Sequence, residues 1–260
     1  MTDTDWLIRV EDLHKRFHVR REKAPSIKRM IVRLLRPYPH EILWALRGVN
    51  LTISPGHIVG LIGSNGSGKS TLLRVIGGVY VPTTGRVSVA GHVGVLFELE
   101  SGFHGELSGM DNILLSGALM GYGRKAIQEA LPRVLEISGL ADFVNVPVKA
   151  YSSGMKFRLG FGIAMAFDPP IVLVDEVLAA ADEGFQRSAY RRLEQCRDNG
   201  AAVVIVSHEM EAVRKHCDRV VWLADGQIRS EGPTEQVLDE YLRWVNHSPQ
   251  KPGARSSGHS

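Results

Sequence analysis

Short apolar runs alternate along the chain with longer segments of helical period, and this alternation predicts an α/β fold. The runs are continuously apolar, as is typical of parallel strands that are buried on both faces. They are residues 58–62, 171–174 and 203–206. Residues 111–143 instead place apolar side chains at helical spacing. The sequence therefore predicts a mostly parallel core sheet, interrupted by a helical subdomain at about residues 99–165.

Other runs predict an antiparallel part. Residues 46–53 alternate apolar and polar positions, and residues 7–10 form a similar short run. Residues 219–223 and 227–229 flank Asp225-Gly226, which is a hairpin signal. Strands are also predicted at residues 87–89 and 93–97. The core is therefore expected to be mixed, with an antiparallel β part.

Residues 1–245 are predicted to form one domain, whose last helix opens at Pro233 and runs to about Val245. Residues 246–260 are polar and rich in Pro, Gly and Ser, which predicts a disordered tail.

Residues 18–43 interrupt the pattern between the first two strands. Within them, residues 26–36 have helical spacing, with one apolar side and one basic side, and Pro37 and Pro39 follow. The apolar side carries Ile27, Met30, Ile31, Leu34 and Leu35, and the basic side carries Lys28, Arg29 and Arg33. The sequence predicts a short basic amphipathic helix. The basic residues clustered from Lys15 to Arg36, opposed only by Glu22, indicate a local anionic partner. A solvated surface decoration is the alternative.

Composition narrows the class of protein. Hydrophobic residues make up 44% and charged residues 23% of the 260, which indicates an ordinary packed core. The net charge of +3 is too small for a general nucleic-acid binder, so no nucleic-acid partner is expected. The two cysteines, Cys196 and Cys217, lack metal-ligand spacing and are predicted to be free thiols. No signal peptide is expected, and no apolar run approaches the roughly 20 residues that span a bilayer.

A glycine-rich loop carries the clearest chemistry. Residues 63–70 fit the pattern G-x-x-x-x-G-K-[ST], and they follow an apolar run and open a helical segment, which is the context this phosphate-binding loop requires. Its backbone N–H groups and the helix N-terminus favour phosphate. Lys69 is predicted to reach the outer phosphates and Ser70 to offer a hydroxyl to Mg²⁺. The predicted nucleotide-binding residues here are Gly63, Ser64, Asn65, Gly66, Ser67, Gly68, Lys69, Ser70 and Thr71.

Two acids follow the apolar run at residues 171–174. Asp175 is predicted to hold Mg²⁺ at the phosphate end of the sheet. Glu176, the next residue, can polarise an attacking water. Two acids after a strand are common in surface turns, but beside a phosphate-binding loop they indicate nucleotide hydrolysis.

Two further segments distinguish among P-loop proteins. Ser152-Ser153-Gly154 precedes a helical run, and small residues at a helix N-terminus can bind a second anion. His208 directly follows the strand predicted at residues 203–206. With these motifs, residues 7 to about 245 resemble the ATP-binding subunits of ABC transporters. In that family the first segment binds the γ-phosphate of ATP held by the opposite subunit, and the histidine contacts the γ-phosphate.

The closest resemblance is to exporters of polysaccharides such as O-antigen, teichoic acid or arabinogalactan precursors. It lies in residues 96–109, in the Tyr-Ser-Ser-Gly-Met form of residues 151–155, and in Asp-Glu-Val-Leu-Ala at residues 175–179. Glu98 stands where most relatives have the Q-loop glutamine, and its carboxylate would also suit Mg²⁺. Departures are Gly105 for proline and Ala180-Ala181 before Asp182. Neither removes a reactive group, so hydrolysis is still expected.

The resemblance implies ATP and Mg²⁺ as cofactors, a homodimer, and a separate integral membrane permease at the cytoplasmic face of the cell membrane. It also implies that Asp182 lies in the D-loop and that an aromatic side chain stacks on adenine, either Phe17 or Trp44. An equivalent of residues 18–43 forms a membrane-facing helix near lipid-linked polysaccharide in such exporters. The alternatives are a soluble ABC ATPase outside transport and an ABC subunit for another substrate.

Overall fold

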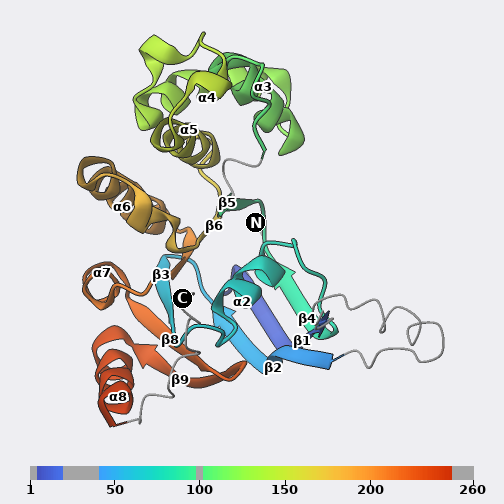
Figure 1. Ribbon diagram of the computed structural model, residues 1–260, viewed down its shortest axis with the longest axis vertical. Helices are drawn as coiled ribbons and strands as arrows, with labels where there is room; N and C mark the ends of the chain where they lie inside the picture. Colours follow the sequence, from blue (N-terminus) through green and yellow to red (C-terminus); the bar gives the residue numbers. More distant parts are fainter. Residues whose placement is uncertain (1–4, 20–40, 98–101, 248–260) are drawn as a thin grey trace, which may run out of the picture.

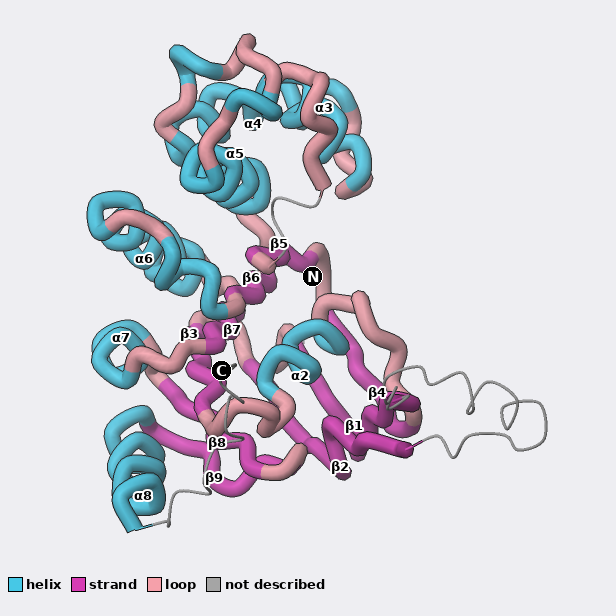
Figure 2. Tube along the Cα trace, in the orientation of Figure 1, coloured by secondary structure: helices cyan, strands magenta, loops and turns pink. Residues whose placement is uncertain are grey.

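Strands in the described residues form two sheets. The computed structural model describes residues 5–19, 41–97 and 102–247. One sheet has three antiparallel strands in the order β2-β1-β4, and the other has six in the order β5-β6-β7-β3-β8-β9 (Figures 1 and 2). The strands are β1 (Ile8–Val19), β2 (Glu41–Ile53), β3 (His57–Ile62), β4 (Thr84–Val89), β5 (Val93–Leu96), β6 (Ile171–Val174), β7 (Ala202–Val206), β8 (Arg219–Ala224) and β9 (Gln227–Pro233).

The larger sheet is parallel except for the β8–β9 hairpin. It is buried on both faces: in β6, Val172 and Val174 pack into one core, whereas Ile171 and Leu173 pack into the other. This two-sided burial explains the continuous apolar runs, because neither face of a strand needs polar residues. The predicted mixed sheet with an antiparallel part is confirmed.

Helices cover both faces of the sheet and build a separate lobe. The helices α6, α7 and α8 contribute to one core, and α2 shares the other core with β1 and β2. In Figure 1, α3, α4 and α5 form a lobe at one end of the molecule, with a core of its own. The helices are α2 (Lys69–Ile76), α3 (Gly109–Leu119), α4 (Arg124–Ser138), α5 (Ser153–Ala166), α6 (Glu183–Asp198), α7 (Met210–His216) and α8 (Thr234–His247), with short 3₁₀ turns η1 (Ala141–Phe143), η2 (Val148–Ala150) and η3 (Glu176–Ala180). The inserted helical subdomain is thereby confirmed.

Several predicted boundaries are wrong. The strands β1 and β2 extend beyond the predicted ranges, and His18 pairs with Ile42 and Val19 with Glu41. The ends of the predicted insert 18–43 are therefore strand, because ladder hydrogen bonds continue past the core. Pro233 ends β9 and does not open the last helix, which starts at Thr234 and continues past Val245 to His247.

Three predictions fall outside the described residues. They are the amphipathic helix at residues 26–36, Glu98, and the tail from residue 248 onward. Within the described ranges, none of the helices combines the length and the apolar character that a membrane crossing needs.

Candidate nucleotide site

The phosphate-binding loop connects β3 to α2 and touches two other strands. Gly63 has φ +143°, and a Cβ there would lie 2.2 Å from the carbonyl oxygen of Leu223 on β8. Gly68 has φ +110°, and a Cβ there would lie 2.7 Å from the carbonyl oxygen of Ala45 on β2. Only glycine fits these positions without a shift of the loop. The conformation of the loop is therefore fixed by the surrounding sheet.

Lys69 turns its ammonium group back onto this loop. The side chain is buried, and Nζ donates to the carbonyl oxygens of Gly63 at 2.9 Å and Ser64 at 3.2 Å. Burial lowers the pKa of Lys69, while the nearby charges of Glu176 and Asp175 act to raise it. A cation that is largely removed from water gains from an anionic ligand. The loop thus presents backbone donors and one buried positive charge, which suits a polyphosphate.

A hydroxyl at the start of α2 and a carboxylate after β6 lie in contact beside Lys69. Ser70 Oγ donates to Asp175 Oδ1 at 3.4 Å, which joins the start of α2 to the end of β6. The same carboxylate oxygen accepts the backbone N–H of Glu176 at 3.1 Å. Mg²⁺ is commonly held by one or two protein oxygens together with phosphate oxygens. This hydroxyl and carboxylate therefore fit a Mg²⁺ ion that arrives with a nucleotide.

Glu176 and His208 face each other across the ends of β6 and β7. Glu176 Oε1 lies 2.8 Å from His208 Nε2, and both side chains are partly exposed. Together with Asp175 they border a pocket of about 120 Å³, whose other lining residues are Leu178, Tyr190, Ile205, Val206, Ser207 and Glu209. The pocket adjoins the phosphate-binding loop through the bond between Asp175 and Ser70. The structure therefore brings the predicted catalytic residues Glu176 and His208 together with Asp175 and the phosphate-binding loop.

Ser152, Ser153 and Gly154 lie on the other lobe. Ser152 is the N-cap of α5, and its Oγ accepts the backbone N–H of Met155 at 3.2 Å. All three residues are exposed. In Figure 1, α5 belongs to the helical subdomain, whereas α2 lies in the core below it. Within one chain, this predicted anion site and the phosphate-binding loop are thus in different lobes.

Asp182 ties these lobes together. Its Oδ1 accepts the backbone N–H of Phe185 at 2.9 Å, and its Oδ2 accepts Nη2 of Arg158 on α5. The Phe185 hydrogen bond, then the Arg158 guanidinium, lower the pKa of Asp182. Arg158 was not predicted. A basic residue on a helix is ordinarily a solvated side chain, and its partner is distant in sequence.

The two candidates for adenine stacking lie on neighbouring strands. Phe17 on β1 packs edge-on to Tyr80, with ring centroids 5.4 Å apart. Trp44 on β2 packs edge-on to His14 at 6.0 Å, and Arg16 lies 5.8 Å from its ring. Tyr80 follows the end of α2 and donates its N–H to the carbonyl oxygen of Arg74. Through Tyr80, Phe17 is thus connected to the C-terminal end of α2. Thr71, on the first turn of that helix, is partly buried.

Comparisons with known sequences identify the family of this chain and several of its relatives. Residues 46–179 match the family described as ABC transporter. The O-antigen export system ATP-binding protein RfbB of Klebsiella pneumoniae is 40% identical over 76% of this chain and 80% of its own length. The teichoic acids export ATP-binding protein TagH of Staphylococcus saprophyticus is 34% identical over 92% of this chain and 89% of its own. RfbB of Myxococcus xanthus is 38% identical over 91% of this chain, which spans 56% of that relative.

Among solved structures, a dimeric post-hydrolysis state of the ATP-binding cassette MJ0796 bound to ADP and Pi superposes with a TM-score of 0.71. It is 23% identical, and the match covers 88% of this chain and 99% of that one. The fold is therefore that of the ATP-binding cassettes. The chain belongs to the ABC transporter family.

Proposed function

We propose that this chain is the ATP-binding and ATP-hydrolysing subunit of an exporter, and that it powers transport of a lipid-linked polysaccharide through a separate membrane subunit. The supporting observation is the convergence of Lys69, Ser70, Asp175, Glu176 and His208 at one end of the larger sheet. The relatives named as O-antigen and teichoic acid export proteins support the substrate class.

In this proposal, each group at the site has one role. The loop N–H groups and Lys69 bind the phosphates of ATP, and Ser70 and Asp175 hold Mg²⁺, which neutralises phosphate charge. Glu176 orients and polarises the attacking water. His208, held 2.8 Å from Glu176, contacts the γ-phosphate. Glu98 is proposed as a further oxygen ligand near Mg²⁺, and Phe17 as the aromatic that stacks on adenine.

The complete site is proposed to form between two copies of the chain. Ser152, Ser153 and Gly154 are exposed at the N-terminus of α5, so they are free to bind the γ-phosphate of ATP on the facing subunit. Asp182 and the next two residues are also exposed, on the lobe that carries the phosphate-binding loop. The dimeric state of the MJ0796 cassette supports the same arrangement for this chain.

The membrane subunit is proposed to dock on the helical subdomain. Apolar side chains of α3 are exposed there, including Leu119 at 75%. Leu114 and Leu115 of α3 are also exposed, as is Met120 directly after the helix. Such a patch on a surface helix is typical of a protein–protein contact. We place the protein at the cytoplasmic face of the membrane, and we propose that the basic residues of the segment 18–43 contact the anionic lipid-linked polysaccharide.

The test is export in cells that carry the membrane subunit but lack this chain. Wild-type protein should restore the polysaccharide at the cell surface. Glu176→Gln should not, because the substitution removes the proposed water-activating carboxylate. The control is Glu240→Gln, the same change at an exposed position of α8. Protein levels are measured by immunoblot.

Normal export with Glu176→Gln at wild-type protein level would contradict the proposal. So would normal surface polysaccharide in cells without the chain. If ATP hydrolysis needs Glu176 but polysaccharide export does not need the chain, the chain is an ATPase for another substrate or outside transport.

A further inference from the structure

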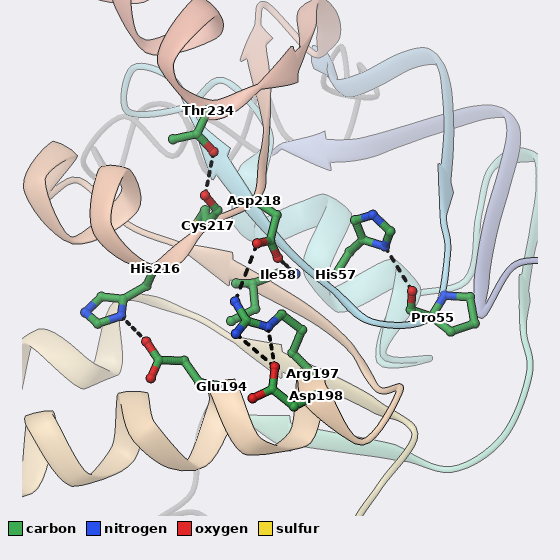
Figure 3. Close-up of polar contacts among 10 residues, drawn as sticks. All are labelled: Pro55, His57, Ile58, Glu194, Arg197, Asp198, His216, Cys217, Asp218 and Thr234. Atoms are coloured by element: carbon green, nitrogen blue, oxygen red, sulfur yellow. Dashed lines mark hydrogen bonds and ion pairs between the residues drawn. The ribbon is translucent and has the colours of Figure 1, made fainter.

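Polar contacts join the C-terminal end of α7 to α6, α8 and β3. His216 Nδ1 lies 2.8 Å from Glu194 Oε1 on α6, and Thr234 Oγ1 at the start of α8 donates to the carbonyl oxygen of Cys217 at 2.6 Å (Figure 3). Asp218 accepts the backbone N–H of Ile58 on β3 at 2.8 Å. The same carboxylate accepts Arg197 of α6 at 3.4 Å. This end of the helix is therefore a fixed point of the core.

Tyr190 connects the end of α7 to the pocket that contains Glu176 and His208. Its ring is stacked on the imidazole of His216, with centroids 4.1 Å apart and the planes 7° from parallel. Tyr190 and Glu194 are four residues apart on α6, so they lie on the same side of that helix and hold His216 between them. Tyr190 is only 8% exposed, and burial raises its pKa to about 12. It also lines the pocket that contains Glu176 and His208.

The helix α7 connects the two places. It begins at Met210, two residues after His208, and ends at His216. Seven helical residues span about 10 Å, which makes α7 a short rigid connection. A shift of His216 against α6 would therefore move the start of α7. His208 would move with it relative to Glu176.

We infer that Tyr190 is a positioning residue for ATP hydrolysis. Its ring lines the pocket that contains Glu176 and His208, and its stack with His216 fixes α7 so that His208 stays within contact of Glu176. This inference rests on the roles proposed above for Glu176 and His208. Tyr190 acts through these residues and through packing, so its ring matters and its hydroxyl does not.

The expected effect lies in the chemical step. Tyr190→Ala should lower kcat for ATP between about 10- and 100-fold, because displacement of a catalytic group by about 1 Å costs on that order. KM for ATP should stay within about twofold, because the phosphate-binding loop lies on β3 and α2 and not on α6 or α7. Tyr190→Phe should retain wild-type kcat. His216→Ala should lower kcat in the same direction, because it removes the other half of the stack.

The experiment is steady-state ATP hydrolysis by the purified full chain and each variant. Melting temperatures and binding of a fluorescent ATP analogue are measured in parallel. Arg191→Ala is the matched control, because Arg191 is the exposed neighbour of Tyr190 on the same helix. Glu176→Gln is included in the series to test the site assignment separately.

Wild-type kcat in folded Tyr190→Ala would overturn the inference, as would a rise in KM at unchanged kcat. A loss in Tyr190→Phe equal to that in Tyr190→Ala would assign the effect to the hydroxyl and also overturn it. If Tyr190→Ala does not fold, Tyr190→Leu and His216→Ala decide by the same criteria. Wild-type turnover in Glu176→Gln would instead contradict the proposed catalytic site, whereas a slow Glu176→Gln beside a normal Tyr190→Ala would contradict only this inference.

Discussion

Lys69 combines burial, hydrogen bonds to the phosphate-binding loop and a lowered pKa. The residue is 5% exposed, and its ammonium group donates to two loop carbonyls, with the charges of Glu176 and Asp175 nearby. Burial alone disfavours the charged form, and the pKa is lowered. A triphosphate would add further opposite charge beside this partly desolvated cation. Lys69 is therefore expected to contribute to nucleotide affinity as well as to turnover.

Lys69→Ala should weaken ATP binding by roughly 10- to 100-fold, the usual effect of losing a hydrogen bond to a charged group. Titration with a fluorescent ATP analogue measures this. Lys125→Ala, which removes an exposed lysine of α4, should leave the affinity unchanged. Equal affinities for wild type and Lys69→Ala would mean that the ammonium group does not contact the nucleotide.

At the residue scale, local motifs predicted the site best. The phosphate-binding loop is recognisable from a few adjacent residues, Asp175 and Glu176 gain their meaning beside it, and His208 was assigned through the family resemblance. The structure brings these residues together. Tyr190 and Arg158 were missed, because their partners are distant in sequence. Tyr190 lies on a helix whose apolar spacing does not distinguish a pocket residue from a core residue.

At the scale of elements, Asp168 joins the two lobes. It follows α5 and accepts from Arg133 on α4 and Arg192 on α6. Burial acts to raise the pKa of Asp168, but hydrogen bonds and charge from the two arginines lower it on balance. The folded protein therefore prefers the ionised carboxylate. Asp168 has φ +47°, a conformation that asparagine also tolerates.

Asp168→Asn should destabilise the protein by about 1 kcal/mol, because the carboxylate is 49% exposed and its ion pairs are screened by water. A loss of this size lowers Tm by roughly 2–4 °C in a protein of this length. The difference from wild type should be full at neutral pH, above the unfolded pKa. It should disappear as the pH falls through the lowered folded pKa. Asp142→Asn, at an exposed position, is the control. A difference that persists unchanged in acid would exclude the ion pairs as its cause.

Element types were easier to predict than their ends. The buried strands β3, β6 and β7 match their apolar runs closely, because burial on both faces admits few polar residues. By contrast, β1 continues past its last buried residue, Leu13, through Lys15, Arg16 and His18, where pairing with β2 holds a polar sequence in strand form. Backbone pairing of this kind leaves little trace in the hydrophobic pattern.

At the scale of the whole molecule, the proposed function divides one site between the two lobes. Lys69 begins α2 and Glu176 follows β6, whereas Ser152 and Gly154 are exposed at the start of α5. No local sequence pattern indicates whether the phosphate-binding loop meets the Ser152–Gly154 segment of the same chain or of a second chain. That expectation came from the family resemblance alone.

Shared sites predict complementation. A heterodimer of a Lys69→Ala chain and a Gly154→Asp chain contains one site with both halves intact, so it should hydrolyse ATP faster than either variant alone. The heterodimer is isolated with a different affinity tag on each chain. If the heterodimer is never more active than either variant alone, the result would contradict a shared site. It would contradict in particular that one complete site per dimer is sufficient for hydrolysis.

The central claim is that ATP is hydrolysed at Glu176 in a dimer that holds two nucleotides. The most direct measurement is light scattering and nucleotide content of Glu176→Gln with ATP and Mg²⁺, together with its turnover. We predict a stable dimer with two ATP molecules and a loss of turnover on the order of 10²- to 10⁴-fold, the usual contribution of a general base. A monomer that retains bound ATP, or turnover at the wild-type rate, would contradict the claim.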